Sequence, residues 1–407
     1  MLSNLFLLLG FALRLFPSGV ALTNVLDNFP LFSTPLSSYR SIQESLFLHQ
    51  VNLTDSTHHP PLLLKLYSFL SNGSVNNIFW AWIDIMVGAS LVKVAKKILP
   101  ERQNHLAFFY AFSPFALLCT YAKSEYLLSN FVLINMINAV LDSKFFAAWI
   151  CLAFATYLDY YCWYFAIPIS YWFWISASNK NNKLIKLFGG LILFIISLSG
   201  LLILSRSISG NWDFLQWYLT AIQFKKLIPN TGLWWYFFTE IFGSFREFYL
   251  CLFNIYGFIY FIPVSYRFME FKKDNKIRNK QSILFVFYFL LTLNTFIHPY
   301  PTLTHHLLSL FLIFPLGVDD YIRLSPLIIH LAYGIWGVMC PVFYYVWMGS
   351  SAGGVGGGGN ANFFYALGLV GSVGLGFMLS DVCWGWIKKE WELDFGRSED
   401  LDKLTQL

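Results

Sequence analysis

Charged residues are scarce in this chain. They make up 12% of its 407 residues, whereas an average soluble domain carries about 25%. So little charge cannot cover the surface of a soluble globule of this length. Disorder is also excluded, because disordered chains are poor in the aromatic and apolar residues that here reach 20% and 57% of the sequence. The composition therefore predicts a polytopic membrane protein.

The sequence also lacks the patterns of disulfide, cofactor and nucleic-acid proteins. Its six cysteines lie in apolar stretches without paired spacing, which is typical of small buried hydrophobic residues. The glycine-rich run Gly353–Gly359 follows no expected strand, so we interpret it as a flexible tether rather than a phosphate-binding loop. The net charge of +5 reflects basic loops beside a membrane. We expect no cofactor and no nucleic-acid partner.

Apolar segments long enough to cross a membrane recur along the chain. A spanning helix needs about 20 mainly apolar residues, and the sequence predicts about twelve transmembrane helices in an all-α fold with lumenal interfacial or re-entrant segments. The expected spans are roughly 2–23, 76–98, 105–122, 125–141, 144–158, 161–178, 187–205, 234–266, 282–297, 303–318, 325–348 and 363–386. The 234–266 segment exceeds one straight pass, so its first part should be broken or re-entrant.

The distribution of lysine and arginine predicts the orientation. Most basic residues fall on one side if both termini are cytoplasmic, in keeping with the positive-inside rule. We expect one transmembrane domain over 1–390 and a polar cytoplasmic tail over 391–407. The basic loop at about 267–281 is then cytoplasmic, and the segments at about 24–75, 206–233, 298–302 and 349–362 are lumenal. Asn52 and Asn72 begin candidate N-glycosylation sequons in the first lumenal loop.

Catalytic residues are hard to find. Membrane enzymes that transfer sugars from lipid carriers need an acidic residue, often a pair, in the first lumenal loop to activate the acceptor or place a metal. Asp27 stands at a suitable position but has no close acidic neighbour. The pairs His58–His59 and His305–His306 are adjacent and cannot share a helix face as zinc ligands. We expect neither a catalytic residue nor a metal site.

A lipid-binding cavity is better supported. Charge inside or at the edge of a span is costly unless it faces protein or water, and irregular backbone at membrane depth is tolerated only when it is buried or lines a cavity. The charged residues in such positions are Asp159, Glu125, Glu240, Arg246 and Asp381. Polar residues at expected lumenal helix ends are Asn230, Asn362 and the segment 298–302. Together they predict a site for an amphiphile with a polar head.

Several stretches in order along the chain carry a resemblance to a known family. They are Pro35-Leu36-Ser37-Ser38, Trp212-Asp213-Phe214, the segment 229–240 (PNTGLWWYFFTE), Tyr300-Pro301-Thr302, Asn362-Phe363-Phe364-Tyr365-Ala366 and Ser380-Asp381. The chain thereby resembles the phosphatidylinositol-glycan class U family, a membrane subunit of the glycosylphosphatidylinositol (GPI) transamidase of the endoplasmic reticulum.

The resemblance implies a non-catalytic, multi-pass subunit in the endoplasmic reticulum membrane. Its expected role is to recognise or hold the GPI lipid, while the cysteine protease chemistry belongs to another subunit. Its partners would be the other transamidase subunits and the GPI lipid, and its fold would be similar to that of lipid-linked sugar transferases (GT-C). Candidate lipid-binding residues are Asn230, Trp234, Tyr300, Asn362, Phe363 and Asp381. A mannosyltransferase using a polyprenyl-phosphate donor, and a pure assembly scaffold, remain as alternatives.

Overall fold

The computed structural model describes residues 2–15, 20–51, 59–70, 73–177, 180–272, 275–318, 321–322, 326–348 and 360–396. Every regular element within these ranges is a helix, which confirms the predicted all-α fold. Helices suit a hydrocarbon environment because each one satisfies its backbone hydrogen bonds internally. The sequons at Asn52 and Asn72 and the run Gly353–Gly359 lie outside the described residues.

The helices follow the expected apolar segments closely. The α-helices are α1 (Leu2–Leu15), α2 (Val20–Asp27), α3 (Tyr39–Gln50), α4 (Pro61–Phe69), α5 (Gly73–Ile98), α6 (Gln103–Ala111), α7 (Pro114–Tyr121), α8 (Tyr126–Leu141), α9 (Phe145–Leu158), α10 (Ala166–Ile175), α11 (Lys180–Ser209), α12 (Leu215–Ile222), α13 (Trp234–Glu240), α14 (Arg246–Phe268), α15 (Lys276–Ile297), α16 (Leu303–Leu316), α17 (Pro326–Met348) and α18 (Ala361–Phe395). Short 3-10 turns occupy η2 (Pro100–Arg102), η3 (Tyr160–Phe165) and η4 (Gly243–Phe245).

Six of the described helices are long and apolar enough to cross a membrane. Their apolar segments are Val75–Ile98, Asn181–Ser209, Gly243–Phe268, Lys276–Ile297, Leu327–Met348 and Ala361–Phe395. Four more apolar helices, α1, α8, α9 and α16, are shorter. The number of about twelve spans therefore stays a prediction. α18 continues to Phe395, into the segment that the sequence assigned to the tail.

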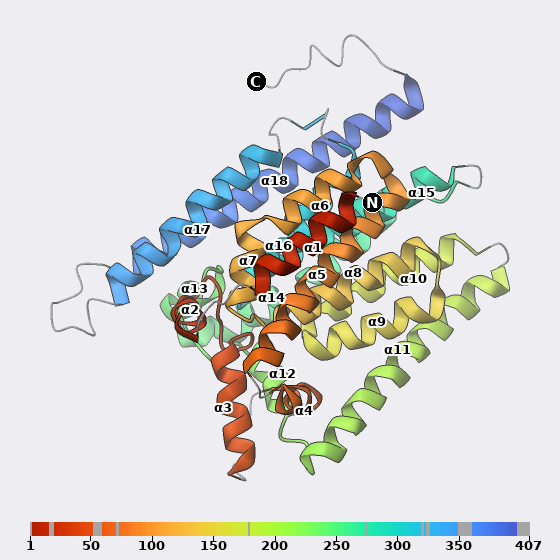
Figure 1. Ribbon diagram of the computed structural model, residues 1–407. Coiled ribbons are helices and arrows are strands. Elements are labelled where there is room, and N and C mark those ends of the chain that lie inside the picture. The colour runs from red at the N-terminus through yellow and green to blue at the C-terminus, as the bar shows by residue number, and fades with distance from the viewer. Residues whose placement is uncertain are drawn as a thin grey trace.

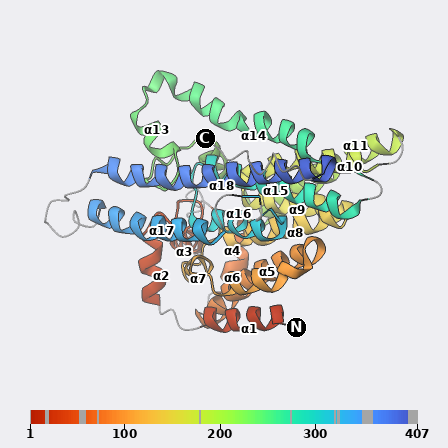
Figure 2. The same cartoon turned by 90° about the horizontal axis from the view of Figure 1, so that it is seen from above.

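The long helices run roughly along one direction, and a group of short helices lies at one end of the molecule (Figure 1). We call this the short-helix end; it contains α2, α3, α4, α12 and α13. The beginning of α15 and the end of α18 lie at the opposite end, so the basic loop 267–281 lies there as well. Seen from above, α17 and α18 lie next to each other, and α1 lies at the far margin beside α5 and α6 (Figure 2).

Two expected spans contain breaks. The 105–122 segment, which the sequence predicts as one helix, is divided into α6 and α7; that prediction is wrong. Ser113 caps α7 by accepting a hydrogen bond from the Ala116 N–H, and Pro114, which has no N–H to donate, opens the helix. The predicted break in 234–266 is confirmed, because α13 ends at Glu240 and α14 begins at Arg246.

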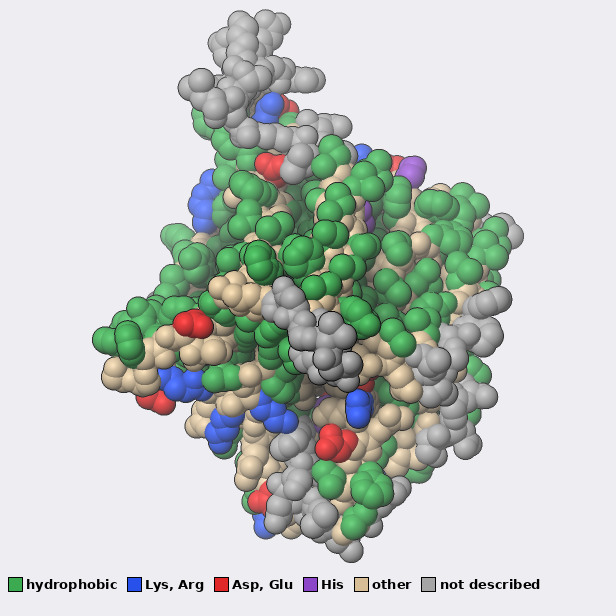
Figure 3. Space-filling model, turned by 90° about the vertical axis from the view of Figure 1, so that its left-hand side faces the viewer, with side chains coloured by type: hydrophobic (Ala, Val, Ile, Leu, Met, Phe, Trp, Pro, Cys, Tyr) green, Lys and Arg blue, Asp and Glu red, His purple; other side chains and the backbone are tan. Residues whose placement is uncertain are grey.

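The core lies around α15 and α16, and the outer helices expose apolar surface. All 14 residues of α16 are buried, whereas only 11% of the apolar segment of α11 is buried. Hydrophobic side chains cover most of the face in Figure 3, and charged side chains are visible in both its upper and its lower part. Exposed apolar residues of α11 and α17 include Ile185, Ile192, Ile196, Ile335 and Val338. Such surfaces suit contact with lipid chains.

Candidate functional site

A small polar chamber lies at the short-helix end, where several helices begin or end. Its volume is about 20 Å³, which is room for about one water-sized group. Its walls come from the segment after α2, the start of α8, the end of α9, α12 and the turn between α15 and α16. The lining residues are Thr34, Leu36, Ser37, Glu125, Tyr126, Ser129, Leu158, Asp159, Trp217, His298, Tyr300 and His305.

Backbone hydrogen bonds hold the segment 31–38 in the wall of the chamber. The Leu303 N–H, the first of α16, donates to the Leu31 carbonyl at 2.8 Å. The Glu125 N–H, just before α8, donates to the Ser37 carbonyl at 3.2 Å. Both are N–H groups at helix starts, which have no acceptor inside their own helix. The segment is therefore fixed between α16 and α8.

Two buried carboxylates face the chamber. Glu125 is 4% exposed, and its Oε2 lies 2.9 Å from Nδ1 of His59, at the start of α4. Asp159 is 7% exposed. Its Oδ1 accepts a hydrogen bond from the Tyr161 N–H at 3.1 Å, and its Oδ2 accepts one from the Tyr126 hydroxyl at 3.2 Å. The chamber is thus acidic, with histidines as the nearest basic groups.

Two histidines meet Asp159 on the other side of the chamber. His298 and His305 are separated by the turn between α15 and α16, and their ring centroids lie 4.5 Å apart. With Asp159 they offer three ligand atoms within 4.8 Å of one another, the residue types of a metal site. The sequence predicted no such cluster, because it compared only histidines adjacent in the chain.

The hydrogen bonds of the two histidines do not fit metal ligation. Nδ1 of His298 accepts from the Tyr300 N–H at 3.1 Å, and Nδ1 of His305 accepts from the Thr302 N–H at 3.0 Å. Histidines that ligate a metal through Nε2 almost always donate a hydrogen bond from Nδ1. Here the single proton of each neutral ring must be on Nε2. Both Nε2 atoms are therefore N–H donors, which cannot ligate a metal.

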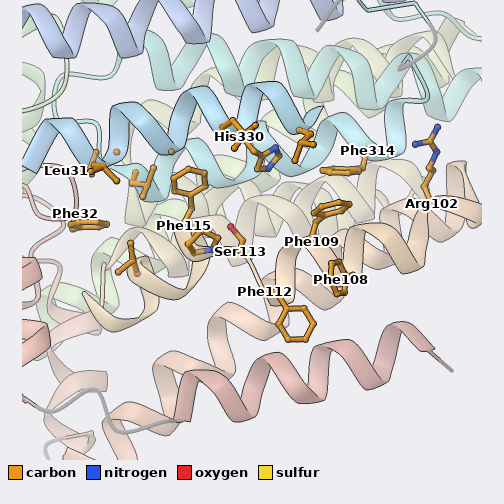
Figure 4. A pocket seen from close by; sticks show the side chains of 18 residues that line it. Leu31, Phe32, Arg102, Phe108, Phe109, Phe112, Ser113, Phe115, Phe314 and His330 are labelled. Atoms are coloured by element: carbon orange, nitrogen blue, oxygen red, sulfur yellow. The ribbon is translucent and has the colours of Figure 1, made fainter. Parts of the chain in front are cut away.

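A larger apolar cavity lies beside the chamber, between α6 and α7 on one side and α16 and α17 on the other (Figure 4). Its volume is about 630 Å³, within the range of small-molecule sites. Arg102 lies at one end of it, and Leu31 and Phe32 lie at the other (Figure 4). The lining is mainly aromatic and aliphatic: Phe32, Phe108, Phe109, Phe112, Phe115, Leu118, Leu303, Phe314, Leu327, Leu331 and Val338.

The apolar cavity and the polar chamber share one wall. Leu31 and Phe32 line the cavity, while Thr34 and Ser37, a few residues further along the same segment, line the chamber. At the start of α16, Leu303 likewise lines the cavity and His305 the chamber. An apolar and a polar compartment thus adjoin at the short-helix end, as an amphiphile requires.

The structure brings Asn230, Trp234 and Tyr300 together behind the chamber. Each is at most 1% exposed. Nδ2 of Asn230 donates to the Pro299 carbonyl at 3.2 Å, and Nε1 of Trp234 donates to the Ile297 carbonyl at 2.6 Å. Burial raises the pKa of Tyr300, so its hydroxyl stays protonated and donates to the Lys226 carbonyl at 2.9 Å. Tyr300 lines the chamber, whereas Asn230 and Trp234 hold the 298–302 turn in place.

The other three predicted residues, Asn362, Phe363 and Asp381, lie at different positions along α18. Asn362 accepts a hydrogen bond from the Tyr236 hydroxyl at 2.5 Å, close to the Trp234 region, and the neighbouring Phe363 is 60% exposed. Asp381 is 19 residues (381 − 362) further along the same helix, which corresponds to about 28 Å. The structure therefore does not bring Asp381 to the other five residues.

The sequence noted the main chamber residues without recognising that they meet. Glu125 and Asp159 stand at the edges of apolar segments, and charge at such positions indicates a cavity. His298 and His305 flank the Pro299–Pro301 turn, which reverses the chain. Trp217 had no such signal, because it lies in the short α12 and joins the chamber only through the tertiary fold.

Comparison with known proteins decides the family. The model of the family described as GPI transamidase subunit PIG-U matches residues 8–371. The GPI transamidase component GAB1 of Saccharomyces cerevisiae is 31% identical, over 97% of this chain and 95% of its own length. This chain belongs to the PIG-U family. The human GPI-anchor transamidase component PIGU is 25% identical over 89% of this chain, and the GAB1 homologue of Schizosaccharomyces pombe is 26% identical over 91%.

Family membership confirms the resemblance that the sequence carries. Most of the stretches on which that resemblance depends meet at the short-helix end. Pro35–Ser38 and Tyr300–Thr302 contribute to the chamber or its walls. The segment 229–240 packs behind the 298–302 turn and also contacts the start of α18. Only Ser380-Asp381 lies well away from this region.

Proposed function

We propose that this chain is the GPI transamidase subunit that holds the GPI lipid while the anchor is attached to precursor proteins. The acyl chains lie in the apolar cavity, and part of the polar head contacts the chamber. The observation that carries the proposal is the wall shared by the two compartments. It places apolar and polar contacts a few residues apart, at Leu31 and Phe32 on one side and Thr34 and Ser37 on the other.

The physical balance of binding assigns different tasks to the two compartments. A lipid enters from the bilayer, whose tails are as apolar as the cavity wall, so burying its chains gains little free energy. The cavity can orient the lipid but cannot select it by apolar contact. Selection must come from the polar groups, where an unmatched buried donor or acceptor costs about 1–3 kcal/mol. The chamber is therefore where the lipid is recognised.

The same proposal covers location and partners. As a transamidase subunit the chain resides in the endoplasmic reticulum membrane and assembles with the other subunits, one of which carries the catalytic residues. The short-helix end faces the lumen, and both termini face the cytoplasm. This orientation agrees with the basic loop 267–281 at the opposite end. The exposed apolar helices α11 and α17 are available for subunits as well as for lipid.

Filling the cavity tests the proposal. Gly334 of α17 lines the cavity, and a Cβ added there meets no atom within 4 Å. Gly334→Leu should therefore fold and assemble normally while occupying the space of a chain. The GPI lipid recovered with the purified complex, measured by mass spectrometry, should fall several-fold, and anchor attachment in cells should fall with it.

A matched control separates cavity filling from the general cost of replacing a helix glycine. Gly376 of α18 also has open space around it but does not line the cavity, so Gly376→Leu should leave both measurements unchanged. Normal lipid recovery and attachment in assembled Gly334→Leu complex would refute the lipid-holding role.

The lipid species that accumulate in depleted cells distinguish the alternatives. Complete but unattached GPI lipids are expected for a transamidase subunit, and incomplete ones would indicate a mannosyltransferase. The transferase candidate Asp27 has local partners: its carboxylate accepts hydrogen bonds from the Ser38 hydroxyl and the Arg40 N–H, both at 3.0 Å. These contacts organise the start of α3 and do not favour catalysis.

A further inference from the structure

The two histidines of the chamber share a hydrogen-bonding state that the backbone imposes. In each ring Nδ1 accepts a backbone N–H, from Tyr300 in one case and Thr302 in the other. A neutral imidazole has one N–H, which must then be on Nε2. Both side chains are 4% exposed, and neither Nε2 has a hydrogen-bond partner in the part of the chain that the structure describes. The chamber thus contains two buried histidine donors without an acceptor, beside the Nε1–H group of Trp217, which also has no partner among the described residues.

Unused acceptors face the same space. Oε1 of Glu125 has no hydrogen-bond partner among the described residues, whereas Oε2 lies 2.9 Å from Nδ1 of His59. Oδ1 of Asp159 accepts one N–H and lies 3.5 Å from Nε2 of His298, too far for a hydrogen bond. Leaving such groups unpaired in a buried site costs about 1–3 kcal/mol each. The arrangement is complementary to a group that both accepts and donates hydrogen bonds.

The chemistry of the chamber selects one class of group. An ammonium can only donate, so it would leave both Nε2–H groups unpaired and facing a cation. A phosphate oxygen can only accept, and it would face two carboxylates. A hydroxyl oxygen accepts two hydrogen bonds and donates one, which matches two N–H donors and a carboxylate. One nitrogen each of His298 and His305 and one carboxylate oxygen of Asp159 lie within 4.8 Å of one another, so the three residues surround a space in which one such oxygen can lie at hydrogen-bonding distance, about 2.8–3.0 Å.

We propose that the chamber binds a single hydroxyl group of a polyhydroxylated lipid head, a cyclitol or a sugar, through the Nε2–H groups of His298 and His305 and an acidic acceptor. The volume of about 20 Å³ accommodates the hydroxyl and not the ring that bears it. The ring lies at the rim, where Leu36 and Leu158 are partly exposed. This inference rests on the lipid-holding role and specifies which part of the head is read.

Asparagine substitutions isolate the chamber donors. In His298→Asn and His305→Asn the amide oxygen takes the place of Nδ1 and still accepts the backbone N–H, while the Nε2–H group is removed. His306→Asn is the control: its ring contacts Tyr333 and does not line the chamber. All variants are purified in the intact transamidase complex. Dissociation constants are measured for complete GPI lipid, phosphatidylinositol and diacylglycerol in detergent micelles.

Each chamber variant should weaken binding of the polyhydroxylated lipids about three- to tenfold, the value of one hydrogen bond, and leave diacylglycerol unchanged. Weakening for GPI lipid alone places the hydroxyl on the glycan, and weakening for phosphatidylinositol as well places it on inositol. Equal weakening for all three lipids, or none, overturns the inference. So does a stoichiometric metal that is lost in the variants. If the unsubstituted complex binds none of the three lipids, the lipid-holding role itself fails.

Discussion

Asp84 offers the sharpest test of how this fold tolerates charge inside an apolar bundle. Asp84 of α5 and Arg14 of α1 form an ion pair at 2.5 Å, and both side chains are 0% exposed. The carboxylate also accepts hydrogen bonds from the hydroxyls of Tyr110 and Thr120, at 2.5 and 3.0 Å. Arg14 donates further to the Ala111 carbonyl at 2.9 Å. The network joins α1 to α5, α6 and α7.

Asp84→Ala should destabilise the protein by about 4 kcal/mol or more. Breaking a buried pair by removing one partner costs about 3–5 kcal/mol, because the remaining charge is uncompensated. Tyr110 also loses its acceptor, at about 1–3 kcal/mol. Thr120 loses less, because its hydroxyl also donates to the Ala116 carbonyl at 3.0 Å. The double variant Arg14→Met, Asp84→Leu removes both charges and should recover most of the loss.

Thermal unfolding of the purified complex, followed by loss of the assembled peak in size-exclusion chromatography, measures these changes. The Tm of Asp84→Ala should fall by about 5 °C. The control is Asp142→Ala, which removes a partly exposed pair with Lys97 at 2.9 Å and should cost at most about 1 kcal/mol. The reasoning is refuted if Asp84→Ala costs no more than Asp142→Ala. It is refuted equally if the double variant is as unstable as the sum of its single changes.

Two further predictions concern α18 and α11. Asn362 and Asp381 are about 28 Å apart along α18, so the effects of Asn362→Ala and Asp381→Ala on anchor attachment should be independent; strong coupling in the double variant would contradict the placement of Asp381. In α11 a Cβ added at Gly190 would lie 2.4 Å from the indole of Trp149, whereas at Gly189 it meets nothing within 4 Å. Gly190→Ala should therefore destabilise by about 1–3 kcal/mol in thermal unfolding, while Gly189→Ala should be neutral or slightly stabilising. Equal effects of the two would contradict the packing of α11 on α9.

The sequence predicted the helices well because apolar length is a local property. The interruption of 234–266 followed from a segment too long for one pass, and the structure ends α13 at Glu240. The division of 105–122 was missed although Ser113-Pro114 is a recognisable helix start. The residues on both sides of Ser113-Pro114 are apolar, so the hydropathy of the whole segment does not reveal the break.

Individual residues of the candidate site could be predicted from the sequence, but their meeting in one chamber could not. Glu125 and Asp159 attracted attention as charges at span edges. Nothing in the sequence places them in one chamber, because that depends on α8 and α9 ending beside the 298–302 turn. The pairing of Arg14 with Asp84 was hidden for the same reason: the two residues are 70 positions apart. Contacts between distant segments are set by packing, which a single sequence does not encode as a local pattern.

The Arg14–Asp84 cluster and the chamber differ in a way that indicates their roles. In the Arg14–Asp84 cluster the guanidinium and the carboxylate are satisfied by protein groups, as a structural element in an apolar bundle requires. In the chamber the fold holds His298 and His305 by their Nδ1 atoms and leaves both Nε2–H groups unpaired. Unpaired buried donors also occur elsewhere among the described residues, for example Nε1 of Trp80 and of Trp149. In the chamber they line a cavity together with two carboxylates, and this combination is the reason to assign ligand recognition to the chamber and stability to the Arg14–Asp84 pair. Accordingly, Asp84→Ala should lower thermal stability, whereas His298→Asn should lower lipid affinity at nearly unchanged Tm.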